Sequence, residues 1–172
     1  MMTIGHSTHS IEEFLRMLTA HGVENLVDVR TIPRSRHNPQ FNRETLPETL
    51  RAAGVAYVHV PELGGLRHAR RDSVNTGWRN LSFRGFADYM QTPEFAAAVA
   101  HLIELSSARR AAIMCSEALP WRCHRSLIAD ALTVRGVAVE HIMSVSSRKP
   151  HTLTEFAHHD RADGDKITYT LP

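Results

Sequence analysis

The sequence predicts a single-domain α/β fold, doubly wound, in which a mostly parallel five-stranded sheet carries helices on both faces and a small C-terminal hairpin follows. Short apolar runs alternate with helical patterns along the chain. With 172 residues, 42% of them hydrophobic and 22% charged, the composition suits one globular domain. We expect a core domain at 1–143 with an arginine-rich excursion at 66–84, and a C-terminal extension at 144–172 packed on that core.

The chain begins with an apolar run at 2–4, which predicts the first strand. A helical pattern follows, with apolar residues at the i, i+3, i+4 and i+7 positions. Ser10 and Glu13 form a capping-box pair at its start, and Gly22 marks its end. These residues predict a strand, a loop and an amphipathic helix.

A second strand is predicted at 26–32 and a third at 55–60. Between them lie a polar, arginine-rich loop and a helix near 46–53, which Gly54 ends. The third strand runs into a Pro-Glu-Leu-Gly-Gly turn.

The segment 66–84 has no clean period, and long loops in compact domains usually carry function. A short helix is expected at 86–90. Thr92 then provides an N-cap and Pro93 the first position of a longer helix.

A fourth strand is predicted at 111–115, followed by a helix at 123–134 that Gly136 ends. The fifth strand is predicted at 137–143. A turn at 162–165 before an Ile-Thr-Tyr run predicts the C-terminal hairpin.

Composition limits where the protein is expected to reside and which ligands it is expected to bind. No apolar run is long enough to cross a bilayer, and the N-terminus lacks the features of a signal peptide, so we expect a cytoplasmic protein with reduced thiols and no membrane partner. The net charge is +2, but only two of the 20 basic residues are lysines. Between residues 30 and 84, ten arginines face four acids, a local balance of 10 − 4 = +6. Guanidinium groups suit phosphate or carboxylate ligands, although they also suit a solvated surface.

Unusual short motifs follow the predicted strand ends, where ligands bind in doubly wound sheets. Carboxylate, imidazole and thiol groups there are candidates for proton transfer or nucleophilic chemistry. The candidate catalytic residues are His6, Asp28, Cys115, Glu117, Cys123 and His124. The candidate ligand-binding residues are Gly5, Ser7, Arg30, Ser35, Gly64, Gly65 and Arg125.

Both cysteines lie in MCSEALPWRCHRSLIADAL, and their chemistry stays open at this level. Six residues separate Cys115 from Arg122, one more than in the anion cradles of cysteine phosphatases and rhodaneses, and Glu117 would repel an oxyanion. Cys123 lies near a helix N-terminus that favours a thiolate, although a free cysteine commonly packs in a core. The C-x7-C-H spacing, even with His6 added, is not a standard zinc pattern, so no metal is expected. A thiol redox pair remains an alternative.

The arginine-rich loops contain Phe41 and Trp78. Arginine and aromatic side chains together suit phosphates and stacked bases, which would make these loops a nucleic-acid-binding module. In the competing interpretation the loops are solvated and Trp78 lies in the core.

Five stretches in order resemble the domain of unknown function 488 family. They are TIGHS, LVDVRTIPRSRHNPQFN, ELGGLR, WRNLSFRGFADYM and the cysteine segment quoted above. The resemblance extends to HTLTEFA at 151–157. It implies a compact α/β protein whose shared signature includes the GHS, DVR and LGG elements, with Pro33 among the matching positions, and it brings no established reaction.

Together these features favour an enzyme or enzyme-like domain that binds an anionic ligand, a nucleotide or nucleic-acid-derived molecule, at the carboxyl edge of the sheet. Arg30, Arg125 and the helix N-terminus at Cys123 would hold the anion, and His6, Asp28 or Glu117 would move protons. The sequence does not identify a cofactor or an oligomeric state, and non-catalytic nucleic-acid binding and thiol redox activity remain the alternatives.

Overall fold

A six-stranded sheet forms the centre of the computed structural model, which describes residues 1–171. The strand order is β3-β2-β4-β1-β5-β6, and only β5 and β6 pair in antiparallel fashion. The strands are β1 (Met2–Gly5), β2 (Asn25–Asp28), β3 (Ala56–His59), β4 (Ala111–Cys115), β5 (Glu140–Ile142) and β6 (Arg148–Pro150). The doubly wound α/β prediction is confirmed, and β6 adds a sixth strand at one edge.

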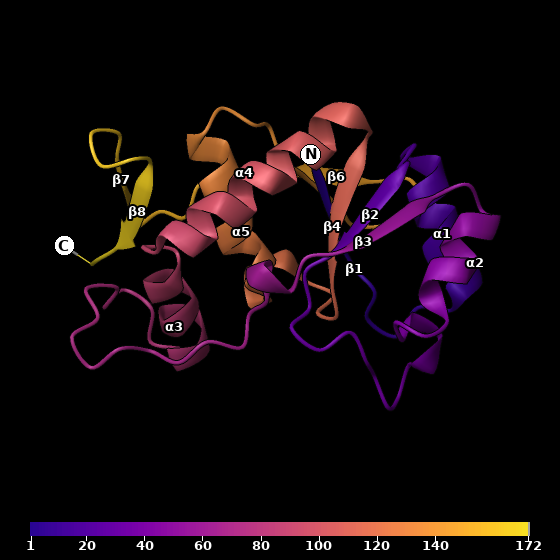
Figure 1. Cartoon of the computed structure of the whole chain (residues 1–172), viewed down its shortest axis with the longest axis horizontal. Coiled ribbons are helices and arrows are strands. Elements are labelled where there is room, and N and C mark those ends of the chain that lie inside the picture. Colours follow the sequence, from indigo (N-terminus) through magenta and orange to yellow (C-terminus); the bar gives the residue numbers. More distant parts are fainter. Residues whose placement is uncertain (172) are drawn as a thin grey trace.

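Helices cover both faces of this sheet (Figure 1). One face carries α1 (Ile11–Ala20) and α2 (Leu46–Ala52). The other carries α4 (Pro93–Ala108) and α5 (Arg125–Val134), and α3 (Leu81–Tyr89) packs against Phe95 of α4 through Phe86. Single 3-10 turns are η1 (Pro39–Phe41), η2 (Pro61–Leu63) and η3 (Pro120–Arg122), and the hairpin is β7 (Ala157–Asp160) with β8 (Lys166–Tyr169).

The local signals at helix ends act as expected. The Ser10 hydroxyl accepts a hydrogen bond from the Glu13 amide at 3.1 Å, and Thr92 caps α4 in the same way through Phe95. Gly22 follows α1 with a φ of 64°, which favours glycine. These contacts explain why the boundaries of α1 and the start of α4 were predictable.

Two apolar cores lie on opposite faces of the sheet, because successive strand residues alternate between faces. Ile4 packs with Phe14 of α1 in one core. Ile113 packs with Phe95 of α4 and Leu127 of α5 in the other. All but Phe95, at 1%, are fully buried. The layers fix the strand ends in place and therefore position the loops that follow them.

Four predicted boundaries were wrong. The strand expected at 137–143 is shorter and spans Glu140–Ile142. The strand expected at 26–32 ends at Asp28, where the side chain turns to hydrogen-bond the Arg30 amide. The helix expected at 86–90 begins at Leu81, because the Asn80 side chain caps it. The last core helix begins at Arg125 and not at Cys123, since η3 precedes it and leaves Cys123 extended.

Residues after 143 contact the core at several places, and one of these contacts is made to a buried carboxylate of α5. Asp130 of α5 accepts hydrogen bonds from His151, from the Thr154 hydroxyl and amide, and from the Tyr169 hydroxyl. Asp130 and Tyr169 are both fully buried. These four bonds attach the loop before the hairpin, and the hairpin itself, to α5.

The chain leaves the neighbouring strands β1 and β4 in opposite directions. It continues from β1 to α1 on one face and from β4 to α5 on the other. In open α/β sheets such a divergence creates the crevice where ligands bind. Within residues 1–171, no helix combines the length and the apolar character needed to span a membrane.

Candidate functional site

A cavity of about 570 Å³ lies at this divergence, and we call it the strand-edge cavity. Of the residues predicted from sequence, those that line it are His6, Arg30, Ser35, Gly65, Cys115, Glu117, Cys123 and His124. They follow the ends of β1, β2, β3 and β4, so the predicted convergence of strand ends is present. Sequence reasoning did not single out Asn80, Ser82 and Phe83, which bring the start of α3 to the cavity.

Arg30 is held rigidly in the wall of this cavity. Its Nε and Nη2 donate to the two Asp28 carboxylate oxygens at 2.9 and 2.6 Å. Nη2 also donates to the Phe41 carbonyl at 2.7 Å, and Nη1 donates to His6 Nε2 at 3.3 Å. Four of the five guanidinium N–H groups therefore have partners among residues 1–171. The remaining Nη1–H is free to donate to a ligand.

Asp28 holds Arg30 and does not face the cavity. Its side chain is fully buried, and its carboxylate accepts the two guanidinium bonds, the Arg30 amide and the Tyr57 hydroxyl. Burial, and then the neighbouring Asp28 carboxylate, raise the pKa of Tyr57 well above its ordinary value. With all these acceptor positions used, the structure makes Asp28 a positioning group for Arg30.

His6 is a neutral, buried imidazole. Its Nδ1 lies 2.9 Å from the Ser7 carbonyl, which can only accept, so Nδ1 carries the proton and Nε2 accepts from Arg30. Burial is the main cause that lowers the pKa of His6 to about 4, and the Arg30 charge lowers it further. The ring stacks on Phe41 with centroids 4.3 Å apart. Both ring nitrogens are occupied, and His6 therefore helps to orient Arg30.

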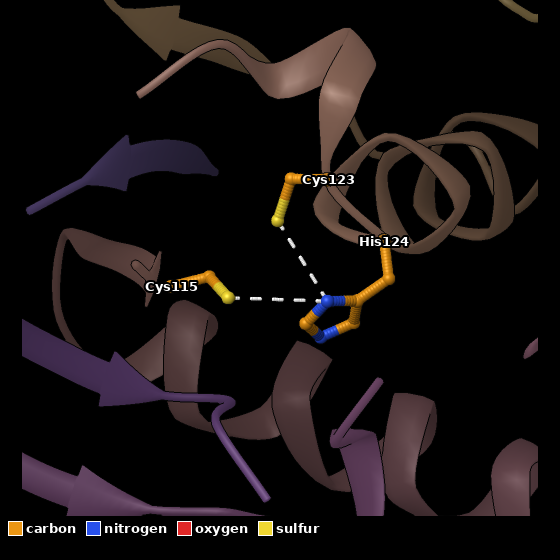
Figure 2. Close-up of side chains that lie close together, drawn as sticks. All are labelled: Cys115, Cys123 and His124. Atoms are coloured by element: carbon orange, nitrogen blue, oxygen red, sulfur yellow. Dashed lines mark hydrogen bonds between the residues drawn. The ribbon is translucent and has the colours of Figure 1, made fainter. Parts of the chain in front are cut away.

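The Cys115 thiol faces the imidazole of His124. His124 Nε2 lies 3.1 Å from the Leu63 carbonyl and must donate to it, which leaves the Nδ1 lone pair directed at sulfur. Cys115 Sγ is 3.9 Å and Cys123 Sγ 3.7 Å from Nδ1 (Figure 2). Two thiols and one imidazole thus meet at the cavity wall.

The two thiols are electrostatically unequal. The pKa of Cys115 lies well below its usual value, chiefly because Cys123 donates a hydrogen bond to it, and the Arg125 charge acts in the same direction. The pKa of Cys123 lies well above its usual value, because its thiol donates that bond and is buried. Cys115 is therefore the thiol of the pair that loses its proton more readily.

Arg125 is almost fully buried and does not line the cavity. Its Nη1 donates to the Glu117 carbonyl at 2.7 Å and its Nη2 to the Ala118 carbonyl at 3.3 Å. Its Nε is buried without a partner among residues 1–171. Arg125 therefore holds the loop after β4, and its charge stabilises the Cys115 thiolate.

Glu117 presents the only carboxylate among the residues that line the strand-edge cavity. Its side chain is exposed and makes no hydrogen bond or ion pair within the described part of the chain. Glu117 is thus the carboxylate available for proton transfer.

Ser7 does not line the cavity. Its backbone, with a φ of 46°, forms hydrogen bonds with Ser116 and His6.

The three candidate glycines make room for protein atoms. A Cβ at Gly5 would overlap the Glu117 carbonyl, and one at Gly64 would overlap Thr31. A Cβ at Gly65 would lie 2.6 Å from His124 Nδ1. Their common role is to let the loops after β1, β3 and β4 approach closely.

The arginine-rich loops are partly satisfied within the protein. Arg34 pairs with Glu44, and the Arg67 guanidinium lies 3.6 Å above the Tyr89 ring centre. Ser35 accepts from the Asn38 amide and also lines the cavity. Phe41 is fully buried, and Trp78 packs against Phe83, Phe156 and Tyr169. The two aromatic side chains expected to stack on bases are instead used in packing.

Comparison with known proteins gives one match. The family model described as "Domain of unknown function DUF488" matches residues 10–132. No curated protein and no solved structure matches the chain. The matched range includes the ends of β2, β3 and β4 and the start of α5, and hence most of the strand-edge cavity.

Proposed function

The chain belongs to the DUF488 family, and on that premise we propose that it is an enzyme whose strand-edge cavity binds a small anionic molecule, a nucleotide or nucleic-acid-derived ligand. The observation that carries the proposal is Arg30, a buried guanidinium fixed by Asp28, Phe41 and His6 with one N–H left at the cavity. A fixed guanidinium loses little entropy when it binds phosphate or carboxylate.

The surroundings of Arg30 support a ligand of small-molecule size. A volume of about 570 Å³ is within the range of small-molecule sites. Arg122 is exposed at the rim and adds positive charge. Glu117, without a protein partner, is in reach of a bound molecule and can transfer a proton to or from it.

Replacing Arg30 with lysine should weaken anion binding by about 10- to 100-fold. Lysine keeps the positive charge but lacks the forked guanidinium, which can donate to Asp28 and to the ligand at the same time. Isothermal titration of the wild-type protein and the variant with AMP and with inorganic phosphate measures this change. Arg51→Lys, an exposed arginine of α2 outside the cavity, is the matched control and should bind as the wild type does. Equal affinities for the Arg30→Lys variant and the wild type would contradict the proposal.

Non-catalytic nucleic-acid binding predicts a different pattern. Affinity for a single-stranded oligonucleotide would then fall steeply with salt, and the loss would spread over Arg34, Arg36 and Arg71 rather than concentrate at Arg30. An enzyme instead requires that Glu117→Gln lower turnover of the ligand while leaving its affinity unchanged. The two measurements separate the classes.

A further inference from the structure

Cys115, Cys123 and His124 bring three metal-ligand atoms together. The two Sγ atoms and one imidazole nitrogen all lie within 4.8 Å of one another. Figure 2 shows both sulfur atoms pointing at the same nitrogen, Nδ1 of His124. We propose that these three side chains bind a zinc ion whose fourth coordination position opens into the strand-edge cavity.

The spacing of the ligand atoms fits zinc. In a tetrahedral site, Zn–S bonds of about 2.3 Å and Zn–N bonds of about 2.0 Å place each sulfur about 3.5 Å from the nitrogen. The observed separations from His124 Nδ1 are 3.9 Å for Cys115 and 3.7 Å for Cys123. Both separations are within a few tenths of an ångström of that value.

The imidazole is already oriented as a metal ligand. His124 Nε2 donates to the Leu63 carbonyl, so the free lone pair is on Nδ1, which faces the sulfurs. Metal-binding histidines commonly donate their second ring N–H to a carbonyl in this way. Packing restrains the ring as well, because it lies against Gly65 and makes a T-shaped contact with Phe86, with ring centroids 5.0 Å apart.

Polar groups also support the thiolates. The Arg125 amide donates to Cys123 Sγ at 3.5 Å, and the buried Arg125 guanidinium has no carboxylate partner among residues 1–171. Two thiolates therefore meet a positive environment in the protein. With a divalent ion the cluster of Cys115, Cys123 and zinc is neutral and does not repel an anion in the cavity.

The fourth position has no protein ligand within the described residues. His6, the fourth ligand considered from sequence, uses Nδ1 for Ser7 and Nε2 for Arg30. Cys115, Cys123 and His124 all line the cavity that Arg30 lines. Three protein ligands with one open position is the arrangement of catalytic zinc sites, in which water or substrate occupies the fourth place. This inference goes beyond the proposed anion site and does not depend on it.

Metal titration of the reduced, full-length protein tests the proposal. Wild-type protein should bind one Zn²⁺ per chain against a chromophoric chelator. Co²⁺ should give the absorption of a tetrahedral thiolate complex, which can arise only from these residues because the chain has two cysteines. Cys115→Ser, Cys123→Ser and His124→Ala should each lower zinc affinity by about 100-fold or more. Gly65→Ala, which displaces the imidazole, should lower it by about 10-fold or more.

Two controls keep the result interpretable. His101→Ala removes an exposed histidine of α4 and should leave zinc affinity unchanged. In the wild-type protein, which needs no substitution, zinc should protect both thiols from alkylation. Three results would overturn the proposal. The first is reduced wild-type protein that binds no zinc, and the second is a Cys115→Ser/Cys123→Ser variant that keeps its zinc affinity. The third is a Cys115–Cys123 disulfide that forms under mild oxidant with zinc present.

Failure here is distinguishable from failure of the proposed function. If the metal site is wrong, AMP binding still depends on Arg30 in zinc-free protein. If the anion site is wrong, zinc still binds with the cobalt spectrum of a thiolate site.

Discussion

Replacing Asp28 with asparagine is expected to lower the free energy of unfolding by about 3 to 5 kcal/mol, the usual cost of leaving one member of a buried ion pair without its partner. Asp28 is fully buried and Arg30 is 5% exposed, so water cannot solvate the guanidinium when the carboxylate is lost. The asparagine amide would also face donors from Arg30 and Tyr57 that need acceptors. Urea unfolding of the purified variant measures the change.

A double variant identifies the cause of this loss. Asp28→Asn/Arg30→Met removes both charges and should be more stable than Asp28→Asn alone, since the unpaired buried charge is gone. The Arg34–Glu44 pair is a matched control with the same 2.6 Å separation but exposed side chains. Glu44→Gln should change stability little, because solvent screens exposed pairs. A small effect at Asp28, equal to that at Glu44, would show that the pair is not structurally important.

The sequence predicted the location of the site better than the roles of its residues. Apolar runs and caps located the strands, and parallel strands place their carboxyl ends at one edge, so the meeting of His6, Arg30, Gly65 and His124 followed from topology. Asp28 and Arg30 were read as separate catalytic and binding groups. They form an ion pair because the chain turns immediately after β2, which brings residues two apart into contact.

The cysteine cluster shows a different limit. The C-x7-C-H spacing resembles no common zinc pattern, because Cys115 ends a strand while Cys123 and His124 precede a helix. The turn η3 brings the chain back between them, and that return is visible only in three dimensions. A signal was nonetheless present in Gly65, whose lack of a side chain provides the space for the His124 ring.

The C-terminal extension was the least predictable part. Strand β6 contains only three exposed residues, including a proline, so it has no apolar signature. Asp130 is the one charged residue in the buried segment 127–132 of α5, and a charged residue there indicates a buried partner. That partner could not be named from sequence, because His151, Thr154 and Tyr169 are at least 21 residues away along the chain.

Lowering the pH from 7.5 to 4 is expected to remove about 3 kcal/mol of stability through His141 alone. Burial, and then the nearby Arg125 and Lys149 charges, lower the pKa of His141 from 6.5 to about 4, although Asp130 acts in the opposite direction. Above pH 6.5 the ring is neutral in both the folded and the unfolded chain. Between pH 6.5 and 4 only the unfolded chain binds the proton, so stability falls as pH falls.

The hydrogen-bond chain around His141 explains why the folded protein resists protonation. Asp130 can only accept from His151 Nε2, so in the neutral ring His151 Nδ1 accepts from His141 Nε2. His141 Nδ1 then accepts from the Thr3 hydroxyl at 2.8 Å. A proton added at Nδ1 of His141 would oppose the Thr3 donor and place a charge beside the buried Arg125.

Substitution of His141 tests the assignment of this pH dependence. His141→Gln keeps one donor and one acceptor but does not titrate, so its stability should vary less between pH 7.5 and 4 than that of the wild type, by about 3 kcal/mol. His6, whose pKa is lowered in the same direction, would account for acid sensitivity that remains. His101→Gln, at an exposed position, should retain the wild-type profile. Parallel profiles for the wild type and His141→Gln would mean that His141 is not the group whose neutrality the fold requires.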